Sequence, residues 1–256
     1  MAERGATVVL GVGFAQADAI SKVAAEFPDT KFSIIDVSWL DAPNLRQYAF
    51  KEHEGSYIVG IAAAKASKTG KVGFVGGMDI GLIRRFACGY VGGVKSINAS
   101  AEVYQNMTGT TPAAWNDPAK GAELTQSQID RGADVVYHAA GGTGAGVIQA
   151  AADAGKLAIG VDSNQNGMAP GSVLTSMLKR VDVAAYETFM DVKNGNFSAG
   201  VHVLGLAEGG VDWALDENNA SLVTADMKAA IESARADILS GKVKVHDYFS
   251  DESCPY

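Results

Sequence analysis

The stretch from Arg131 to Asp162 reads RGADVVYHAAGGTGAGVIQAAADAGKLAIGVD and decides how the chain folds. An apolar, β-branched run leads through a glycine-rich turn into an alanine-rich segment, and a second apolar run ends at an aspartate. This order is typical of a strand–helix–strand unit in a parallel sheet. The unit therefore predicts an α/β fold.

A copy of this unit lies near the start of the sequence. Arg4-Gly-Ala-Thr-Val-Val leads to Asp36 as Arg131-Gly-Ala-Asp-Val-Val leads to Asp162, at an offset of 126 to 127 residues. Internal self-similarity of this kind predicts two lobes with the same topology. The alternative is chance similarity of two strand–helix units, but the shared RGA-x-VV spelling favours the repeat.

The alternation of β-branched runs and alanine-rich segments continues along nearly the whole chain. Strands are expected at residues 7–12, 32–37, 71–75, 101–105, 134–139, 157–161, 173–176 and 200–206. Helices are expected at residues 17–27, 56–66, 80–96, 117–131, 146–154, 179–193 and 225–239. The polar step KASKTGK, residues 65–71, is the expected seam between the lobes.

The two copies of the repeat have unequal leading segments. From the seam, the second copy is preceded by the 61 residues 71–131, a complete βαβα unit, whereas four residues precede the first copy. If the lobes match, the prediction is that 57 residues of the first lobe are absent. A lobe without its first strand exposes the edge of a strand that should be central, so weak binding or low stability is expected unless that segment comes from elsewhere.

Composition narrows the class of protein. The 21 Lys and Arg against 29 Asp and Glu give a net charge of −8, which argues against a nucleic-acid partner and a polybasic membrane patch. The sequence contains no run of 18 apolar residues, so no membrane span is predicted. The first residues lack the basic and apolar regions of a signal peptide. The 30 glycines among 256 residues show no collagen period, so the excess is assigned to tight turns.

Signatures of catalysis and of metal binding are missing. The four histidines form no HExxH or other short metal spacing, and neither a G-x-S-x-G elbow nor a Walker A sequence occurs. Two cysteines, Cys88 and Cys254, exclude a disulfide framework, and Cys88 in FACGYVGG is expected to be a small core residue. No catalytic residue, metal or cofactor is therefore predicted.

A rival interpretation is an enzyme that binds a nucleotide cofactor on a doubly wound sheet. Gly11-Val12-Gly13 followed by Asp36 imitates a dinucleotide fingerprint, but Gln16 stands where the third glycine belongs. Gly142-Thr143-Gly144 likewise has Val147 at the third position. Ordinary tight turns between strand and helix explain both stretches.

The candidate binding residues follow the expected strands, because ligands of open parallel sheets bind beyond the carboxyl ends of the strands. Asp162 ends the run LAIGVD, where a carboxylate can accept hydrogen bonds from two adjacent hydroxyls such as those of a ribose, or cap a turn. Lys179 stands at the expected start of a helix, where a cation is unfavourable without a partner, although solvation at the surface is an alternative. Trp115 and Phe14 are loop aromatics that could stack on a base or plug the core.

Eight phrases of the sequence resemble the basic membrane protein family of ABC transporter substrate-binding proteins, several of which bind purine nucleosides. The phrases are GVGFAQADAI, FPDTKFSIID, FKEHEGSYIVGIAAA, GKVGFVGGMDI, WNDPAKGAE, RGADVVYHAAGGTGAGV, IGVDSNQ and VLTSMLKRVD. The resemblance implies a type I periplasmic-binding fold of two Rossmann-like lobes with parallel sheets. Lobe one is then expected at residues 1–70 with 173–206, and lobe two at 71–172 with 207–256.

The resemblance also implies a function and a site. The expected function is a non-enzymatic receptor that binds a purine nucleoside in the cleft between the lobes and serves an ABC permease. Asp162, Lys179 and the glycine turn Gly141-Gly142 match ligand contacts of the family, Trp115 matches a base-stacking position, and Phe14 is a further candidate. Members are extracytoplasmic, periplasmic or lipid-anchored, whereas the family's opening segment, signal and acylated cysteine are not found in this sequence.

Overall fold

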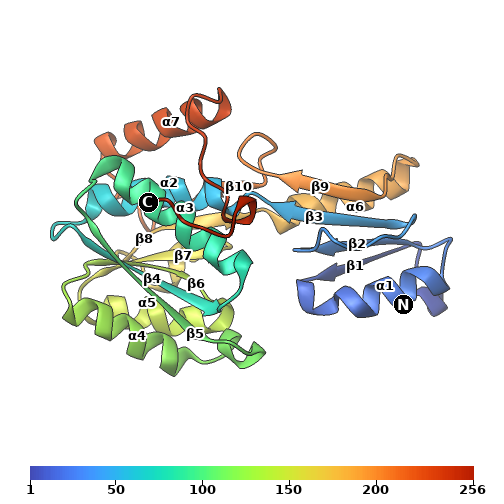
Figure 1. Cartoon of the computed structure of the whole chain (residues 1–256), viewed down its shortest axis with the longest axis horizontal. Helices are drawn as coiled ribbons and strands as arrows, with labels where there is room; N and C mark the ends of the chain where they lie inside the picture. The colour runs from blue at the N-terminus through green and yellow to red at the C-terminus, as the bar shows by residue number, and fades with distance from the viewer. The chain divides into compact units, whose positions relative to one another are not determined.

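The computed structural model describes all residues 1–256 and divides the chain into two compact units. Unit 1 consists of residues 1–51 and 180–210, and unit 2 consists of residues 52–179 and 211–256. The chain therefore passes three times between the units. In Figure 1 unit 1 combines blue and orange ribbon, because its two segments lie far apart in the sequence.

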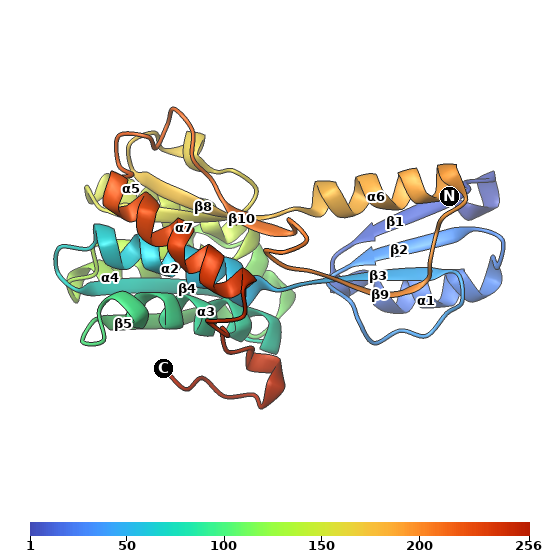
Figure 2. The ribbon, with the colours of Figure 1, turned by 90° about the horizontal axis from the view of Figure 1, so that it is seen from above.

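Unit 1 is built on a four-stranded parallel sheet with the strand order β1-β2-β3-β9. Its strands are β1 (Val8–Val12), β2 (Lys31–Ile35), β3 (Leu45–Phe50) and β9 (Gly200–Leu204), and its helices are η1 (Ala2–Arg4), η2 (Phe14–Gln16), α1 (Ala17–Glu26) and α6 (Val181–Asn194). Phe32 and Ile34 pack against α1, whereas Ser33 contacts Thr188 of α6. Because side chains alternate across a strand, α1 and α6 cover opposite faces of this sheet (Figure 2).

Strand β3 was not among the strands expected from the sequence, because its polar residues Arg46 and Gln47 hide the pattern. Both are buried, and both are paired. The Nη1 of Arg46 lies 2.7 Å from Oδ2 of Asp191 in α6, and its Nε donates to the carbonyl of Ser198 at 2.9 Å. Burial of a charge requires such partners, which a sequence does not reveal when they lie 145 residues away.

Unit 2 contains a six-stranded sheet with the order β10-β8-β7-β6-β4-β5, parallel except for β10. The strands are β4 (Lys71–Met78), β5 (Glu102–Gly109), β6 (Val135–Ala139), β7 (Leu157–Asp162), β8 (Val173–Lys179) and β10 (Val211–Trp213). The helices are α2 (Glu52–Ala66), α3 (Gly81–Ile97), η3 (Pro112–Trp115), α4 (Pro118–Asp130), η4 (Gly141–Thr143), α5 (Gly144–Asp153), η5 (Asn166–Met168), α7 (Ala225–Leu239) and η6 (Tyr248–Ser250). Figure 1 shows α2 and α3 on one face of this sheet and α4 and α5 on the other.

Helices α2 and α3 approach closely because glycines line their interface. A Cβ on Gly93 would collide with the carbonyl of Tyr57, and one on Gly89 would collide with the backbone of His53. A Cβ on Gly60 would meet the carbonyl of Tyr90 in the same way. The glycine-rich composition of this region therefore serves helix packing as well as turns.

The unit boundaries differ from the lobes expected from the sequence, 1–70 with 173–206 and 71–172 with 207–256. Residues 52–70 and 173–179 lie in unit 2, and residues 207–210 lie in unit 1. The physical reason is packing: α2 is buried against α3, and β8 completes its hydrogen bonds with β7. The polar seam at 65–71 is an ordinary helix-to-strand turn inside unit 2.

The two cysteines form a disulfide, so Cys88 is buried as expected but is not simply a small core residue. Their Cα atoms are 5.6 Å apart, and 166 positions separate them in the sequence. The bond attaches the C-terminal segment, residues 245–256, to α3. Tyr256 of this segment also packs on Gly92, where a Cβ would collide with its ring.

Candidate functional site

Five of the six candidate residues lie at or beyond the carboxyl ends of the parallel strands of unit 2. Asp162 is the last residue of β7 and pairs in register with Leu178 of β8, so Lys179 follows at the adjacent strand end. Trp115 ends η3, beyond β5, and Gly141 and Gly142 begin η4, beyond β6. This is the edge at which ligands of open parallel sheets bind.

Asp162 has a left-handed backbone with φ of 63°, which few residues other than glycine, asparagine and aspartate adopt. The side chain is exposed at the strand end. Two partly buried hydrogen bonds fix the loop that follows: Val161 donates its backbone N–H to Oε1 of Gln165 at 2.8 Å, and Gln165 donates its backbone N–H to Oγ of Ser176 at 2.9 Å. The position of the carboxylate is therefore set by the backbone.

His138 contacts both the loop after β7, through Gln165, and the end of the turn after β6, through Gly144. It is fully buried at the end of β6, and its Nε2 lies 2.9 Å from the same Oε1 of Gln165. Because an amide oxygen only accepts hydrogen bonds, Nε2 carries the proton in this contact. Burial lowers the pKa of His138 from 6.5 to about 4, although the bond to Gln165 acts in the opposite direction. Gly144 packs on this ring and leaves no room there for a Cβ.

The glycine turn after β6 and the η3 loop are held together. Thr143 donates its hydroxyl to the carbonyl of Ala114 at 2.8 Å and accepts the N–H of Asp117 at 2.7 Å. Gly141 has a φ of 57°, which requires a residue that tolerates the left-handed region. The partly buried ring of Trp115 covers Gly77 at the end of β4, where a Cβ would collide with it. The indole therefore lies across the strand ends.

Lys179 is buried, so the alternative of a solvated surface lysine is wrong. Its side chain is 5% exposed, and its Nζ lies 3.5 Å from Oε1 of Glu52, which is 1% exposed. Lys179 also ends β8 and does not start a helix, because α6 begins at Val181. Its neighbour Arg180 pairs at the surface with Asp182, with Nη2 and Oδ2 at 2.8 Å.

Phe14 belongs to unit 1. It begins η2 directly after β1 and Gly13, and its partly buried ring packs against the core formed by α1 and β2. The structure thus places Phe14 at the carboxyl end of the unit 1 sheet, with part of its surface accessible.

Sequence reasoning missed Glu52, Arg85 and Asp247, which form a buried and a partly buried ion pair next to Lys179. The Nη1 of Arg85 in α3 lies 3.0 Å from Oε2 of Glu52. The only signal in the sequence is a charge inside an otherwise apolar helix, as in the run LIRRFACGY. Asp247 stands 162 positions from Arg85, so no local pattern relates them.

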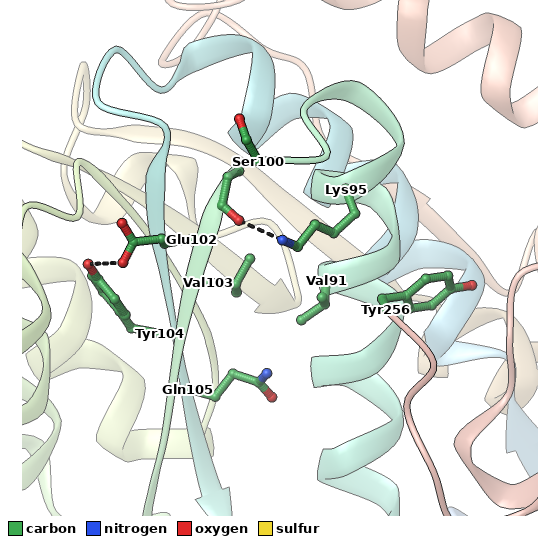
Figure 3. Close-up of a pocket in the computed structure, with 9 residues that line it drawn as sticks. Val91, Lys95, Ser100, Glu102, Val103, Tyr104, Gln105 and Tyr256 are labelled. Atoms are coloured by element: carbon green, nitrogen blue, oxygen red, sulfur yellow. Dashed lines mark hydrogen bonds between the residues drawn. The ribbon is translucent and has the colours of Figure 1, made fainter.

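A cavity of about 380 Å³ lies away from these residues, between α3 and the amino-terminal part of β5. Figure 3 shows Val91, Lys95, Glu102 and Tyr256 around it. The ammonium of Lys95 donates to the carbonyl of Ala101 at 2.8 Å, and Glu102 accepts from the hydroxyl of Tyr104 at 2.9 Å. Because these polar groups bond to one another, the cavity is not the candidate site.

No group of three or more His, Cys, Asp or Glu side chains is arranged to hold a metal ion. None of the helices is both long and apolar enough to cross a membrane.

The sequence model of one family, described as ABC transporter substrate-binding protein PnrA-like, matches residues 1–247. The chain is 35% identical to the ABC transporter nucleoside-binding protein BmpA of Lactococcus lactis, over 95% of this chain and 72% of that protein. It is 32% identical to basic membrane protein D of Borreliella burgdorferi, over 93% of this chain and 70% of the relative.

Among solved structures, an ABC transporter solute-binding protein from Aeropyrum pernix has a TM-score of 0.82 and 29% identity, covering 93% of this chain and 76% of its own. A solute-binding protein from Conexibacter woesei, at 24% identity and a TM-score of 0.77, shares the fold. These similarities confirm the expected α/β fold of the type I periplasmic-binding class.

Proposed function

Because this chain belongs to the PnrA-like family of ABC transporter substrate-binding proteins, also called basic membrane proteins, we propose that it binds a purine nucleoside and delivers it to an ABC permease. The family consists of substrate-binding proteins and not of enzymes. The name of the Lactococcus lactis relative supports a nucleoside as the ligand.

The observation that carries the proposal is the placement of an anion and a cation at the ends of neighbouring strands. Asp162 ends β7 in register with Leu178, and Lys179 ends the neighbouring strand β8 one residue later, at the carboxyl edge of the unit 2 sheet. A carboxylate that accepts from two hydroxyls and an ammonium that donates to them are the groups that a ribose edge requires. In this proposal Asp162 binds the ribose hydroxyls and Lys179 donates to the same hydroxyls.

The base is assigned to the aromatic and glycine residues of the same edge. Trp115 provides a planar surface for stacking, and Gly141 and Gly142 allow a ligand to approach the backbone closely. Phe14, from unit 1, is the candidate for a further aromatic contact.

The proposed location is extracytoplasmic, either periplasmic or anchored to the membrane. The disulfide between Cys88 and Cys254 supports it, because disulfides persist in oxidising compartments and are rare in the cytosol. Substrate-binding proteins of ABC transporters act together with a permease, so a permease is the proposed protein partner.

Isothermal titration calorimetry of the purified protein tests the ligand class. Adenosine, guanosine and inosine are titrated in parallel with ribose, free adenine and NADH. The proposal expects saturable heat with at least one nucleoside and weaker or no heat with ribose or adenine alone. Binding of a sugar but of none of the three nucleosides would refute the nucleoside assignment, and binding of NADH alone would favour a cofactor-dependent enzyme.

A further inference from the structure

Four charged side chains form a continuous row that ends at Lys179. The Nζ of Lys179 lies 3.5 Å from Oε1 of Glu52, and Oε2 of Glu52 accepts from Nη1 of Arg85 at 3.0 Å. Arg85 then binds Asp247 through both of its remaining nitrogens, with Nε 2.8 Å from Oδ1 and Nη2 2.5 Å from Oδ2. One carboxylate thus bridges two cations, and a second carboxylate closes the row.

Because these charges are buried, the row would destabilise the folded protein if one of its members were missing. The side chains of Glu52, Arg85 and Lys179 are 1%, 9% and 5% exposed. A buried charge that loses its partner destabilises a protein strongly, whereas a paired one is tolerated. The positive charges of Lys179 and Arg85 balance the negative charges of two carboxylates, Glu52 and Asp247. Burial would raise the pKa of Asp247, but the hydrogen bonds and charge of Arg85, assisted by His53, hold that pKa below its usual value.

The C-terminal segment holds the far end of the row. The ring of Phe249 lies 5.0 Å from the guanidinium carbon of Arg85 and packs on Gly81. The disulfide joins Cys254 to Cys88, three positions after Arg85 on α3. Asp247 is therefore fixed from both sides, by the ion pair and by the segment that contains it.

Glu52 and Lys179 also occupy special places in the chain. Glu52 is the first residue of unit 2 after one crossing between the units, and Lys179 is the last residue of unit 2 before another. Each therefore lies at the end of a segment of unit 2. A lysine side chain has four rotatable bonds, so an ammonium at such a position needs a fixed partner to keep one orientation.

We infer that Glu52 is a positioning residue for ligand binding, which orients the ammonium of Lys179 and is itself held by Arg85 and Asp247. The inference rests on the proposed function, because it requires that Lys179 contacts the nucleoside. Glu52 touches no ligand in this account and acts only through Lys179.

The test is a double-mutant cycle measured by calorimetry with adenosine, guanosine and inosine. Lys179→Met is expected to lower affinity at least tenfold, and Glu52→Gln, which keeps the side-chain shape but removes its charge, about tenfold. In the Lys179→Met background, Glu52→Gln is expected to cause no further loss, because its effect passes through the missing ammonium. Asp226→Asn breaks an exposed ion pair between α2 and α7 and serves as the control, with affinity within twofold of the wild type.

Two results would overturn the inference while leaving the proposed function intact: full affinity of Glu52→Gln, or an equal loss with and without Lys179. Full affinity of Lys179→Met for the nucleosides would instead remove Lys179 from the proposed site. Should Glu52→Gln fail to fold, Asp247→Asn replaces it, since that carboxylate is 31% exposed. A loss of affinity that vanishes in the Lys179→Met background supports positioning, and unchanged affinity of Asp247→Asn refutes it.

Discussion

Asp36 and Asp162 share a left-handed backbone, with φ of 65° and 63°, and both lie at the carboxyl end of a strand in a parallel sheet: Asp36 directly follows β2, and Asp162 is the last residue of β7. The two residues occupy the same position in the two copies of the sequence repeat. They are the only residues other than glycine with positive φ before the C-terminal segment, where Glu252 is the third. The repeat is therefore reproduced in backbone geometry as well as in sequence.

Substitution of Asp162 separates backbone strain from ligand binding. Asp162→Ala is expected to lower the free energy of unfolding by about 1–2 kcal/mol, because alanine is strained at positive φ, whereas asparagine tolerates it. Asp36→Ala is the matched control and should show a similar loss in urea denaturation. Asp162→Asn should keep its stability yet bind adenosine, guanosine and inosine at least tenfold more weakly, because it loses the charged acceptor. Undiminished affinity of Asp162→Asn would contradict the assigned role.

Trp115 offers a second test of the site. Trp115→Ala is expected to weaken nucleoside binding by about 1–3 kcal/mol, the range for loss of one base-stacking contact. Trp115→Phe keeps a planar ring and should recover most of the affinity. Calorimetry distinguishes the two, and equal losses for both variants would indicate that the indole acts as packing over Gly77 and not as a stacking surface.

The buried His138 predicts a pH-dependent stability. Because its pKa is about 4 in the folded protein and near 6.5 when unfolded, the unfolded chain binds more protons between these values. The stability is therefore full above pH 6.5, and the free energy of unfolding decreases as the pH falls toward 4, by up to roughly 3 kcal/mol. Urea unfolding at several pH values measures it. His138→Gln should have a smaller slope over this range, and an unchanged slope would show that other groups cause the pH dependence.

The glycine interface between α2 and α3 predicts a packing defect. Gly93→Ala would place a Cβ against the carbonyl of Tyr57, so a loss of about 1–3 kcal/mol or more is expected. Gly167→Ala is the control, because its nearest neighbour, Asn218, lies 3.9 Å from the added Cβ. Thermal melting compares the two. A stability of Gly93→Ala equal to that of the control would mean that the helices can move apart at little cost.

The disulfide predicts a redox-dependent stability. It closes a loop with a sequence separation of 166, for which the chain-entropy estimate is about 5 kcal/mol as an upper value. Dithiothreitol should lower the melting temperature of the wild type and leave that of the double variant Cys88→Ala, Cys254→Ala unchanged. A wild type that melts identically with and without the reductant would show that the bond contributes little.

Much of the fold could be predicted from residue pattern. Every expected strand and helix exists, with ends that shift by a few residues, because strands and helices bury one face and so repeat apolar residues at a fixed period. The strands β3 and β10 were missed. In β3, buried Arg46 breaks the apolar pattern, and β10 has three residues, too few to show a period.

The candidate site also has features that could be predicted from the sequence and features that could not. The positions of Asp162, Gly141 and Gly142 at the strand ends could be predicted, because strand ends and glycine turns are marked locally in the sequence. The burial of Lys179 could not, because it depends on Glu52, Arg85 and Asp247, which come from distant segments.

The sequence by itself determined the α/β class, the order of most elements and the repeat that places Asp36 and Asp162 at equivalent strand ends. These properties follow from local propensity and short-range periodicity. Only the tertiary structure decided that α2 and β8 belong to unit 2, that Cys88 pairs with Cys254 and that Lys179 is buried beside Glu52. Each of these depends on which distant surfaces pack together, and the energy of a buried contact is set by its partner rather than by the residue alone.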